Sequence, residues 1–118
     1  MSAPDPRALL LGERADVTFA ALSDRTRRAI LVRLAEAPDD AGAVARDLEV
    51  SRQAVAKHLR ILENAGLVHS TSVSRRRVHE VDAARIAEVS DLLGVVARGW
   101  DRRLEAIKRE AERREPQG

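Results

Sequence analysis

Residues 51–60 combine side chains whose chemistry suits a nucleic acid. Arginine can donate two hydrogen bonds to guanine O6 and N7, and glutamine can pair with N6 and N7 of adenine. Lysine and arginine also neutralise backbone phosphates. The segment holds all of these groups: Ser51, Arg52, Gln53, Lys57 and Arg60. We predict that Arg52 and Gln53 reach base edges of double-stranded DNA, and that Lys57 and Arg60 bind phosphates.

A helix has to present these side chains on one face and pack its other face on a core. Three apolar residues recur at steps of four and three and so share one face: Val55, Leu59 and Leu62. Ser51 can cap the helix start through its hydroxyl and present that start to a phosphate. Gly66 can end the helix, because glycine accepts a left-handed backbone. The pattern predicts a recognition helix over residues 51–65 that fits a major groove.

The segment after Gly66 changes to a strand pattern. β-branched residues are frequent in residues 67–73 and 78–81, with a polar tip between them. The pattern predicts a β-hairpin over residues 67–81, which is a wing because it directly follows a recognition helix. The tip carries three consecutive arginines: Arg75, Arg76 and Arg77. Because arginine binds phosphates and gains from the negative potential of a narrow minor groove, we expect the wing to contact DNA there.

The positive charge is concentrated in the same part of the chain. Residues 51–81 carry six basic and two acidic side chains, whereas residues 1–50 carry seven basic and nine acidic ones. Residues 82–118 are balanced, with eight of each. This distribution is typical of a protein that binds a polyanion on one surface. A solvated face with clustered charges is the alternative.

Three further helices with apolar residues at helical spacing are expected before the recognition helix: residues 9–22, 25–35 and 41–48. The last of them and the recognition helix are joined by a tight turn and form a helix-turn-helix. We expect Arg27 and Arg28 to form structural ion pairs with nearby acids such as Asp24. The expected fold class is mainly α with a small β-hairpin (α+β): a winged helix-turn-helix of five helices and a two-stranded wing.

The fifth helix is expected over residues 83–113. Its apolar residues recur at steps close to a heptad, and a helix of this length spans about 45 Å. A small domain cannot cover such a stripe, so we expect a second copy to cover it about a two-fold axis. The expected dimer interface comprises Leu11, Phe19, Val89, Leu93, Val96, Trp100 and Leu104. Two alternatives stay open: the stripe packs on its own domain, or Trp100 lines a ligand pocket.

Composition limits the remaining classes. The 118 residues contain no cysteine, which excludes disulfides and thiolate metal sites. No long apolar run or signal sequence is visible, so we expect a cytoplasmic protein without a membrane span. We expect one domain over residues 9–113, with disordered ends at residues 1–8 and 114–118. No phosphate-binding glycine loop or zinc-protease motif is present, so we expect no enzyme.

Three segments together resemble the ArsR/SmtB family of bacterial winged-helix repressors: ALSDRTRRAIL (residues 21–31), SRQAVAKHL (residues 51–59) and LENAGLV (residues 62–68). The resemblance implies a homodimer that binds pseudo-palindromic operator DNA and represses transcription until a signal releases it. The chain departs from the family pattern at Arg25, Ala56 and Ser74, where proline, a hydroxyl residue and glycine are common. The missing hydroxyl at Ala56 implies a different base preference.

The resemblance does not extend to the metal ligands of the family's sensors. The positions that hold cysteines in those sensors fall near Asp40 and Gly42, and the last helix holds Asp91 but no histidine. We therefore expect no metal and no other cofactor, and the sequence does not define an effector.

The three histidines lie elsewhere: His58, His69 and His79. His58 borders the apolar face of its helix, so that burial and DNA contact are both open. His69 can face His79 across the hairpin, which leaves a weak metal site open. Two other functions also stay open: a winged-helix module that binds a protein instead of DNA, and an activator instead of a repressor.

Overall fold

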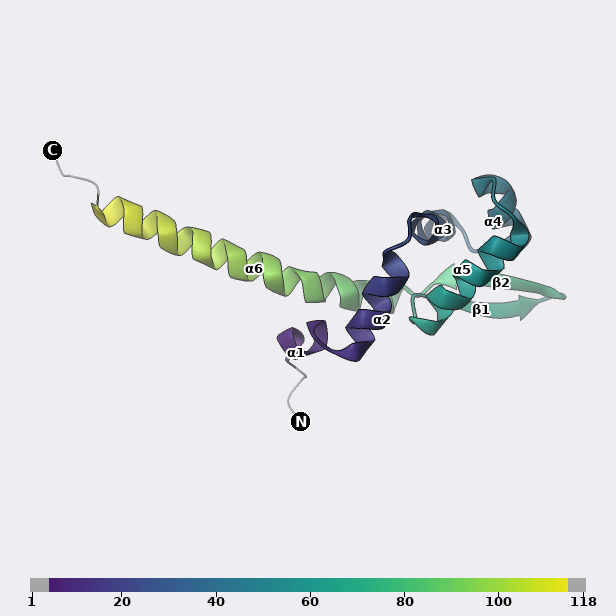
Figure 1. Cartoon of the computed structure of the whole chain (residues 1–118), viewed down its shortest axis with the longest axis horizontal. Coiled ribbons are helices and arrows are strands. Elements are labelled where there is room, and N and C mark those ends of the chain that lie inside the picture. Colours follow the sequence, from purple (N-terminus) through teal and green to yellow (C-terminus); the bar gives the residue numbers. More distant parts are fainter. Residues whose placement is uncertain (1–4, 115–118) are drawn as a thin grey trace.

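The computed structural model describes residues 5–114, which form six helices and one two-stranded sheet. In chain order these are α1 (Pro6–Leu10), α2 (Glu13–Leu22), α3 (Arg25–Glu36), α4 (Ala41–Leu48), α5 (Arg52–Asn64), β1 (Val68–Val73), β2 (Arg76–Val81) and α6 (Ala83–Arg114). Helices α2 to α5 and the hairpin gather at one end, and α6 runs away from them as a long rod (Figure 1). The predicted fold class, mainly α with a two-stranded wing, is confirmed.

Side-chain caps set where the helices of the body begin. Asp24 accepts the backbone N–H of Arg27 at 2.9 Å at the start of α3. Asp40 begins α4 in the same way, and Ser51 begins α5 by accepting the N–H of Ala54 at 3.0 Å. Each cap satisfies a backbone donor that has no partner inside its helix, which stabilises the helix by about 1 kcal/mol.

The predicted helix over residues 9–22 is interrupted. The chain bends at Leu11 and Gly12, and Gly12 becomes the N-cap of α2. Before the bend, Asp5 accepts the N–H of Arg7 and Pro6 occupies the first turn, so α1 begins inside the segment 1–8 that we expected to be disordered. Residues 1–4 and 115–118 of the predicted disordered ends lie outside the described residues.

One aliphatic core holds the recognition helix in place. Its fully buried members come from α3, α4, α5 and the segment before β1: Ile30, Leu34, Val44, Val55, Leu59, Leu62 and Leu67. Burial of each such side chain contributes about 1.5–3 kcal/mol. The apolar face predicted for α5 is confirmed, since all three of its members are buried here. The polar face of α5 must then point to solvent.

The wing is a tight hairpin whose register runs from Val68 opposite Val81 to Val73 opposite Arg76. Ser74 and Arg75 form the two-residue tip, with φ values of 46° and 70°. Two successive left-handed residues match the twist of a hairpin, so the tip closes without the glycine common in the family. Strand β2 begins at Arg76, two residues earlier than the pattern predicted.

The structure contradicts the open alternative in which His69 faces His79 across the hairpin. His69 stands opposite Glu80, and its Nε2 lies 3.4 Å from the Glu80 carboxylate. His79 is opposite Ser70, one register position away, so the two histidines point to opposite faces of the hairpin. Among the described residues no group of three or more His, Asp or Glu side chains could hold a metal ion.

Helix α6 has a packed base and an exposed rod. Arg85, Val89 and Leu92 are buried at its base, against α1, α2 and the core. Beyond them α6 extends outward, which gives the molecule dimensions of 75 × 38 × 20 Å. None of the helices between residues 5 and 114 is both long and apolar enough to cross a membrane.

Candidate nucleic-acid interface

Helix α5 presents the predicted contact residues to solvent. Four of them are exposed on the side away from the core: Arg52, Gln53, Lys57 and Arg60. Ser51 caps the helix, as predicted, and leaves the first turn with Arg52 and Gln53 at its open end. A helix N-terminus carries partial positive charge, so this end attracts phosphate as well as base edges. Contact of these residues with DNA stays a prediction.

A groove of about 730 Å³ separates α4 and α5 from the wing. Six arginines line it: Arg46, Arg52, Arg60, Arg75, Arg76 and Arg77. Only two carboxylates, those of Asp40 and Glu63, lie among its lining residues. The structure thus brings Arg52 and Arg60 of α5 and the arginines of the wing to one concave, cationic surface, whereas Gln53 and Lys57 are not among its lining residues. Such a surface concentrates positive potential and attracts a phosphate backbone.

The groove includes one cation that the sequence analysis missed. Arg46 lies in the last turn of α4 and is exposed. The helix that carries Arg46 was predicted correctly. The position of Arg46 in the first helix of the helix-turn-helix, just before the turn, could have identified it as a candidate for DNA contact. In this motif the first helix crosses the DNA backbone, so Arg46 is placed for phosphate.

The three wing arginines are not equivalent. Arg75 is exposed at the tip, and none of the carboxylates in residues 5–114 pairs with it. Arg77 Nη2 lies 3.9 Å from Glu63 Oε2 of α5, at the outer limit of an ion pair. Arg76 pairs with two carboxylates, although its side chain is 58% exposed: its Nη2 donates to Asp40 Oδ2 at 2.6 Å and to Asp39 Oδ1 at 3.2 Å, and its Nε donates to Asp40 Oδ2 at 3.0 Å.

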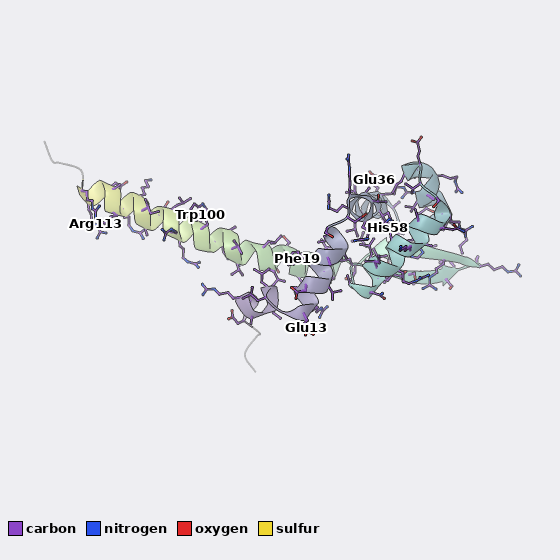
Figure 2. All side chains as sticks on the ribbon, in the orientation of Figure 1. Glu13, Phe19, Glu36, His58, Trp100 and Arg113 are labelled. Atoms are coloured by element: carbon purple, nitrogen blue, oxygen red, sulfur yellow. The ribbon has the colours of Figure 1, made fainter. Side chains whose placement is uncertain are left out.

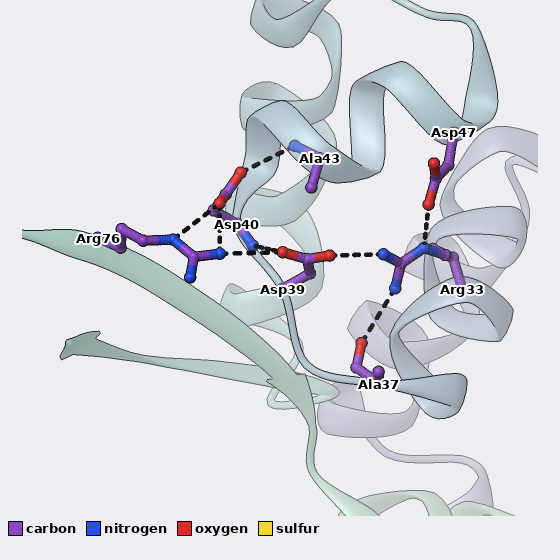
Figure 3. A network of polar contacts seen from close by, with 7 residues as sticks. All are labelled: Arg33, Ala37, Asp39, Asp40, Ala43, Asp47 and Arg76. Atoms are coloured by element: carbon purple, nitrogen blue, oxygen red, sulfur yellow. Dashed lines mark hydrogen bonds and ion pairs between the residues drawn. The ribbon is translucent and has the colours of Figure 1, made fainter.

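These contacts belong to a longer network (Figure 3). Arg33 of α3 donates from Nη2 to Asp39 Oδ2 and from Nε to Asp47 Oδ2, both at 2.6 Å. Its Nη1 also donates to the carbonyl of Ala37 at 3.1 Å. The chain Asp47–Arg33–Asp39–Arg76–Asp40 therefore connects α3, α4 and the wing through alternating charges.

The network lowers the pKa values of two carboxyls. The pKa of Asp40 lies below its usual range, because the Ala43 N–H and then the Arg76 guanidinium donate to it. The pKa of Asp39 is also lowered, first by the N–H of Asp40 and, against the opposing effect of burial, by Arg33. Both groups are therefore more firmly ionised than free carboxyls.

The expected ion pairs of Arg27 and Arg28 with Asp24 are wrong. Arg27 Nε donates to the carbonyl of Ala21 at 2.7 Å, and Arg28 Nη1 donates to that of Leu22 at 2.7 Å. The last carbonyls of α2 have no partner inside the helix, so the two guanidinium groups satisfy them instead. The Asp24 carboxylate is occupied as a helix cap.

His58 is half-buried beside Arg27. Its Nδ1 lies 3.3 Å from Arg27 Nη1. Arginine can only donate, so Nδ1 is the acceptor in this hydrogen bond. The structure thus favours the structural alternative for His58, and its predicted DNA contact stays a prediction.

The residues predicted for a dimer interface separate into two groups. Val89 belongs to the protomer's own core and Phe19 is partly buried against that core, so Val89 is not available to a partner. Leu11 is 83% exposed at the bend between α1 and α2. The remaining residues form an exposed stripe with one further member, Ile107, along the rod: Leu93, Val96, Trp100, Leu104 and Ile107. Figure 2 shows Trp100 on the rod, far from the body.

A second groove, of about 550 Å³, lies between α1, α2 and α6. Its apolar lining includes Leu9, Leu92 and Val95, and Trp100 is not among its lining residues. A ligand pocket at Trp100 stays an untested alternative.

Comparison with known proteins places this geometry in a family. Residues 22–71 match the family model described as a helix-turn-helix domain. The chain is 44% identical over 89 residues to the HTH-type transcriptional regulator Rv2034 of Mycobacterium tuberculosis, which covers 75% of this chain and 80% of that protein. The solved ArsR-like transcriptional regulator from Rhodococcus sp. RHA1 is 43% identical, with a TM-score of 0.73 over 83% of this chain and 92% of that one.

The chain belongs to the ArsR-like family of winged helix-turn-helix regulators. As an ArsR-like protein it is a DNA-binding transcription regulator, and both of these relatives are named as transcriptional regulators. The same fold occurs in the homodimeric winged helix-turn-helix DNA-binding domain Mb0332 of Mycobacterium bovis, at 24% identity and a TM-score of 0.64 over 82% of this chain and 90% of that one.

Proposed function

We propose that this ArsR-like chain is a dimeric repressor that binds a pseudo-palindromic operator in double-stranded DNA. In each protomer α5 enters the major groove, and the wing lies on the neighbouring backbone or minor groove. The observation that carries the proposal is the cationic groove, in which arginines from α4, α5 and the wing surround the exposed first turn of the recognition helix. Bound over a promoter, such a dimer blocks transcription by occupying the DNA.

Contacts to bases and to phosphates come from different residues in this proposal. Arg52 and Gln53 lie in the first turn of α5, which approaches base edges most closely in this docking mode. Lys57, Arg60 and Arg46 bind phosphates on either side of the groove, and Arg75 binds at the wing tip. Arg52 and Gln53 therefore set the sequence preference. The phosphate-binding side chains set the affinity and its dependence on salt.

The exposed stripe of α6 supports the dimer. Leu93, Val96 and Trp100 are each more than half exposed, at 52%, 57% and 56%. Apolar side chains aligned along one helix face are exposed to water at a cost in free energy, so their burial by a second copy of the chain favours association. A two-fold axis through paired α6 helices presents two recognition helices to one DNA duplex, with half-sites about 34–36 Å apart. The homodimeric Mycobacterium bovis domain offers a precedent in the same fold.

The proposal is tested by selecting bound duplexes from a random pool and measuring their affinity by band shift. We expect an inverted repeat with half-sites about one helical turn apart, and binding with a log–log salt slope of about −7, from four phosphate contacts in each protomer. A promoter that carries the selected repeat should then be silenced in a reporter strain by the wild-type chain and not by the Arg52→Ala variant. A folded protein that binds no duplex at low salt would contradict the proposal.

A further inference from the structure

Strand β2 is attached to the helix-turn-helix at two levels. At His79 the two backbones pair: the Asp39 N–H donates to the His79 carbonyl at 3.1 Å, and the His79 N–H donates to the Asp39 carbonyl at 2.8 Å. Nearer the tip, the Arg76 side chain donates to Asp39 and Asp40 (Figure 3). The backbone pair at His79 still allows the hairpin to swing about that point. The His79 side chain adds a contact between its Nδ1 and Glu63 Oε1 at 3.1 Å, and Arg77 adds an ion pair with Glu63 at 3.9 Å. Arg76 makes the shortest side-chain contacts near the tip, so we expect it to resist a displacement of the tip most strongly.

We infer that Arg76 is a positioning residue: it holds the wing against the start of α4 and leaves contact with the duplex to its neighbour Arg75. The inference rests on the proposed function, in which the wing touches DNA. It assigns different roles to two arginines that are adjacent in the chain and identical in chemistry.

The carboxylate of Asp40 both caps helix α4 and binds Arg76. Its Oδ1 accepts the N–H of Ala43 at 2.8 Å and so begins α4. Its Oδ2 accepts both Nε and Nη2 of Arg76, at 3.0 and 2.6 Å. The same group therefore fixes the first turn of α4 and the base of the wing tip relative to each other.

Asp39 extends this attachment into the body. Its Oδ1 accepts from Arg76 and its Oδ2 accepts from Arg33, whose side chain is only 16% exposed. An isolated ion pair at the surface contributes little, because water screens it and two flexible side chains lose entropy. Here one guanidinium meets two carboxylates that are already held by a helix cap and by a largely buried arginine, so less entropy is lost on pairing.

A direct contact of Arg76 with DNA would undo this arrangement. Asp40 lines the cationic groove, where Arg76 is its ion-pair partner and Arg46 adds a weaker electrostatic attraction. If Arg76 turned to a phosphate, the carboxylates of Asp39 and Asp40 would face the incoming backbone without it, and like charges would repel. Arg75 carries no such cost, because none of the carboxylates in residues 5–114 pairs with it.

The decisive variant is Asp40→Asn, because the two roles predict opposite signs. Asparagine caps a helix as well as aspartate does, so α4 stays folded. If Arg76 positions the wing, the variant loosens the tip and weakens operator binding by about 3- to 10-fold. If Arg76 binds phosphate, the variant frees the guanidinium and removes a negative charge, so binding becomes tighter. Asp47→Asn is the matched control, since it removes the same charge from the same network without touching Arg76.

The salt dependence separates the two arginines. Arg75→Gln removes one phosphate contact from each protomer and should reduce the log–log salt slope of the dimer by about 1.8. Arg76→Gln should weaken binding at every salt concentration and leave the slope unchanged. Tighter binding by Asp40→Asn, or an equal loss of slope in Arg75→Gln and Arg76→Gln, would overturn the inference.

The attachment of the wing by Arg76 can also be measured without DNA, through the stability of the protein. In a double-mutant cycle of thermal unfolding, Arg76→Gln and Asp40→Asn should be coupled, whereas Arg75→Gln and Asp40→Asn should be additive. If the wild-type protein binds no duplex, the proposed function fails while this coupling still reports the attachment of the wing. If the wild-type protein binds the operator and the coupling between Arg76→Gln and Asp40→Asn is absent, the positioning role of Arg76 is wrong while the proposed function stands.

Discussion

Arg85 Nη2 donates to Thr18 Oγ1 at 2.6 Å, and this hydrogen bond joins the base of α6 to the middle of α2. Both residues are buried, at 6% and 1% exposure. Thr18 Oγ1 in turn donates to the carbonyl of Arg14 at 3.0 Å, and Arg85 Nη1 donates to Glu88 at 2.9 Å. Through Thr18 the long helix is attached to the DNA-binding body.

Replacement of this acceptor should destabilise the fold. Thr18→Val keeps the shape but leaves a buried guanidinium without one partner, and Arg85 Nε already has none in the structure. We expect the free energy of unfolding to fall by about 1–3 kcal/mol, measured by urea denaturation. Thr71→Val makes the same chemical change at an exposed position of β1 and should change stability by less than about 0.5 kcal/mol. Equal effects of the two variants would argue against a structural role for this hydrogen bond.

Sequence preference should depend on Arg52. Arg52→Ala removes a donor placed for guanine, so we expect discrimination at one position of each half-site to fall by about 1–3 kcal/mol. Competition band shifts with single-base operator variants measure this. Arg75→Ala serves as the comparison, because a phosphate contact weakens all duplexes alike. Loss of discrimination in both variants would contradict the division between base and phosphate contacts.

Dimerisation should be visible through the single tryptophan. Trp100 is 56% exposed in the protomer and lies in the middle of the exposed stripe. On association its ring should leave water, so its fluorescence emission should shift to the blue as protein concentration rises. Trp100→Ala should weaken the dimer by at least about 30-fold in sedimentation equilibrium, since buried aromatic anchors contribute about 2 kcal/mol or more. Val32→Ala, at an exposed apolar site on α3, is the control and should leave association unchanged.

Acid should weaken the attachment of the wing. The pKa values of Asp39 and Asp40 are lowered in the folded protein, so their ionised forms are favoured by folding. Their contribution to stability is complete above the pKa of a free carboxyl and is lost as the pH falls through the lowered values. Urea denaturation between pH 7 and pH 3 should show the loss, and its pH dependence should be smaller in Asp40→Asn. A pH dependence identical to that of the wild type would show that Asp40 does not contribute.

Local signals in the sequence predicted the elements that position the interface. The apolar spacing of Val55, Leu59 and Leu62 and the cap at Ser51 depend only on residues within a few turns, so α5 was predicted nearly to its ends. The bend at Gly12 was missed, because the apolar pattern continues across it and only the caps of α1 and α2 show it.

The contacts of the charged groups could not be predicted in this way. Arg76 meets Asp40 across 36 positions of the chain, and Arg27 meets carbonyls of α2 that become available only once that helix ends. Sequence proximity made Asp24 the obvious partner of Arg27. Tertiary packing decides which acceptor a long side chain reaches, and the spacing of apolar residues in the sequence does not predict that packing.

The two carboxylates in the cationic groove, Asp40 and Glu63, bear on how the protein searches a genome. A groove lined by arginines without any carboxylate would bind DNA of every sequence tightly, because phosphate contacts do not depend on sequence. In the proposed complex the two carboxylates offset part of that charge, which would shorten the residence on unrelated DNA and leave more of the binding free energy at the operator to base contacts. A moderate charge thus favours fast exchange between sites and a wider gap between target and background.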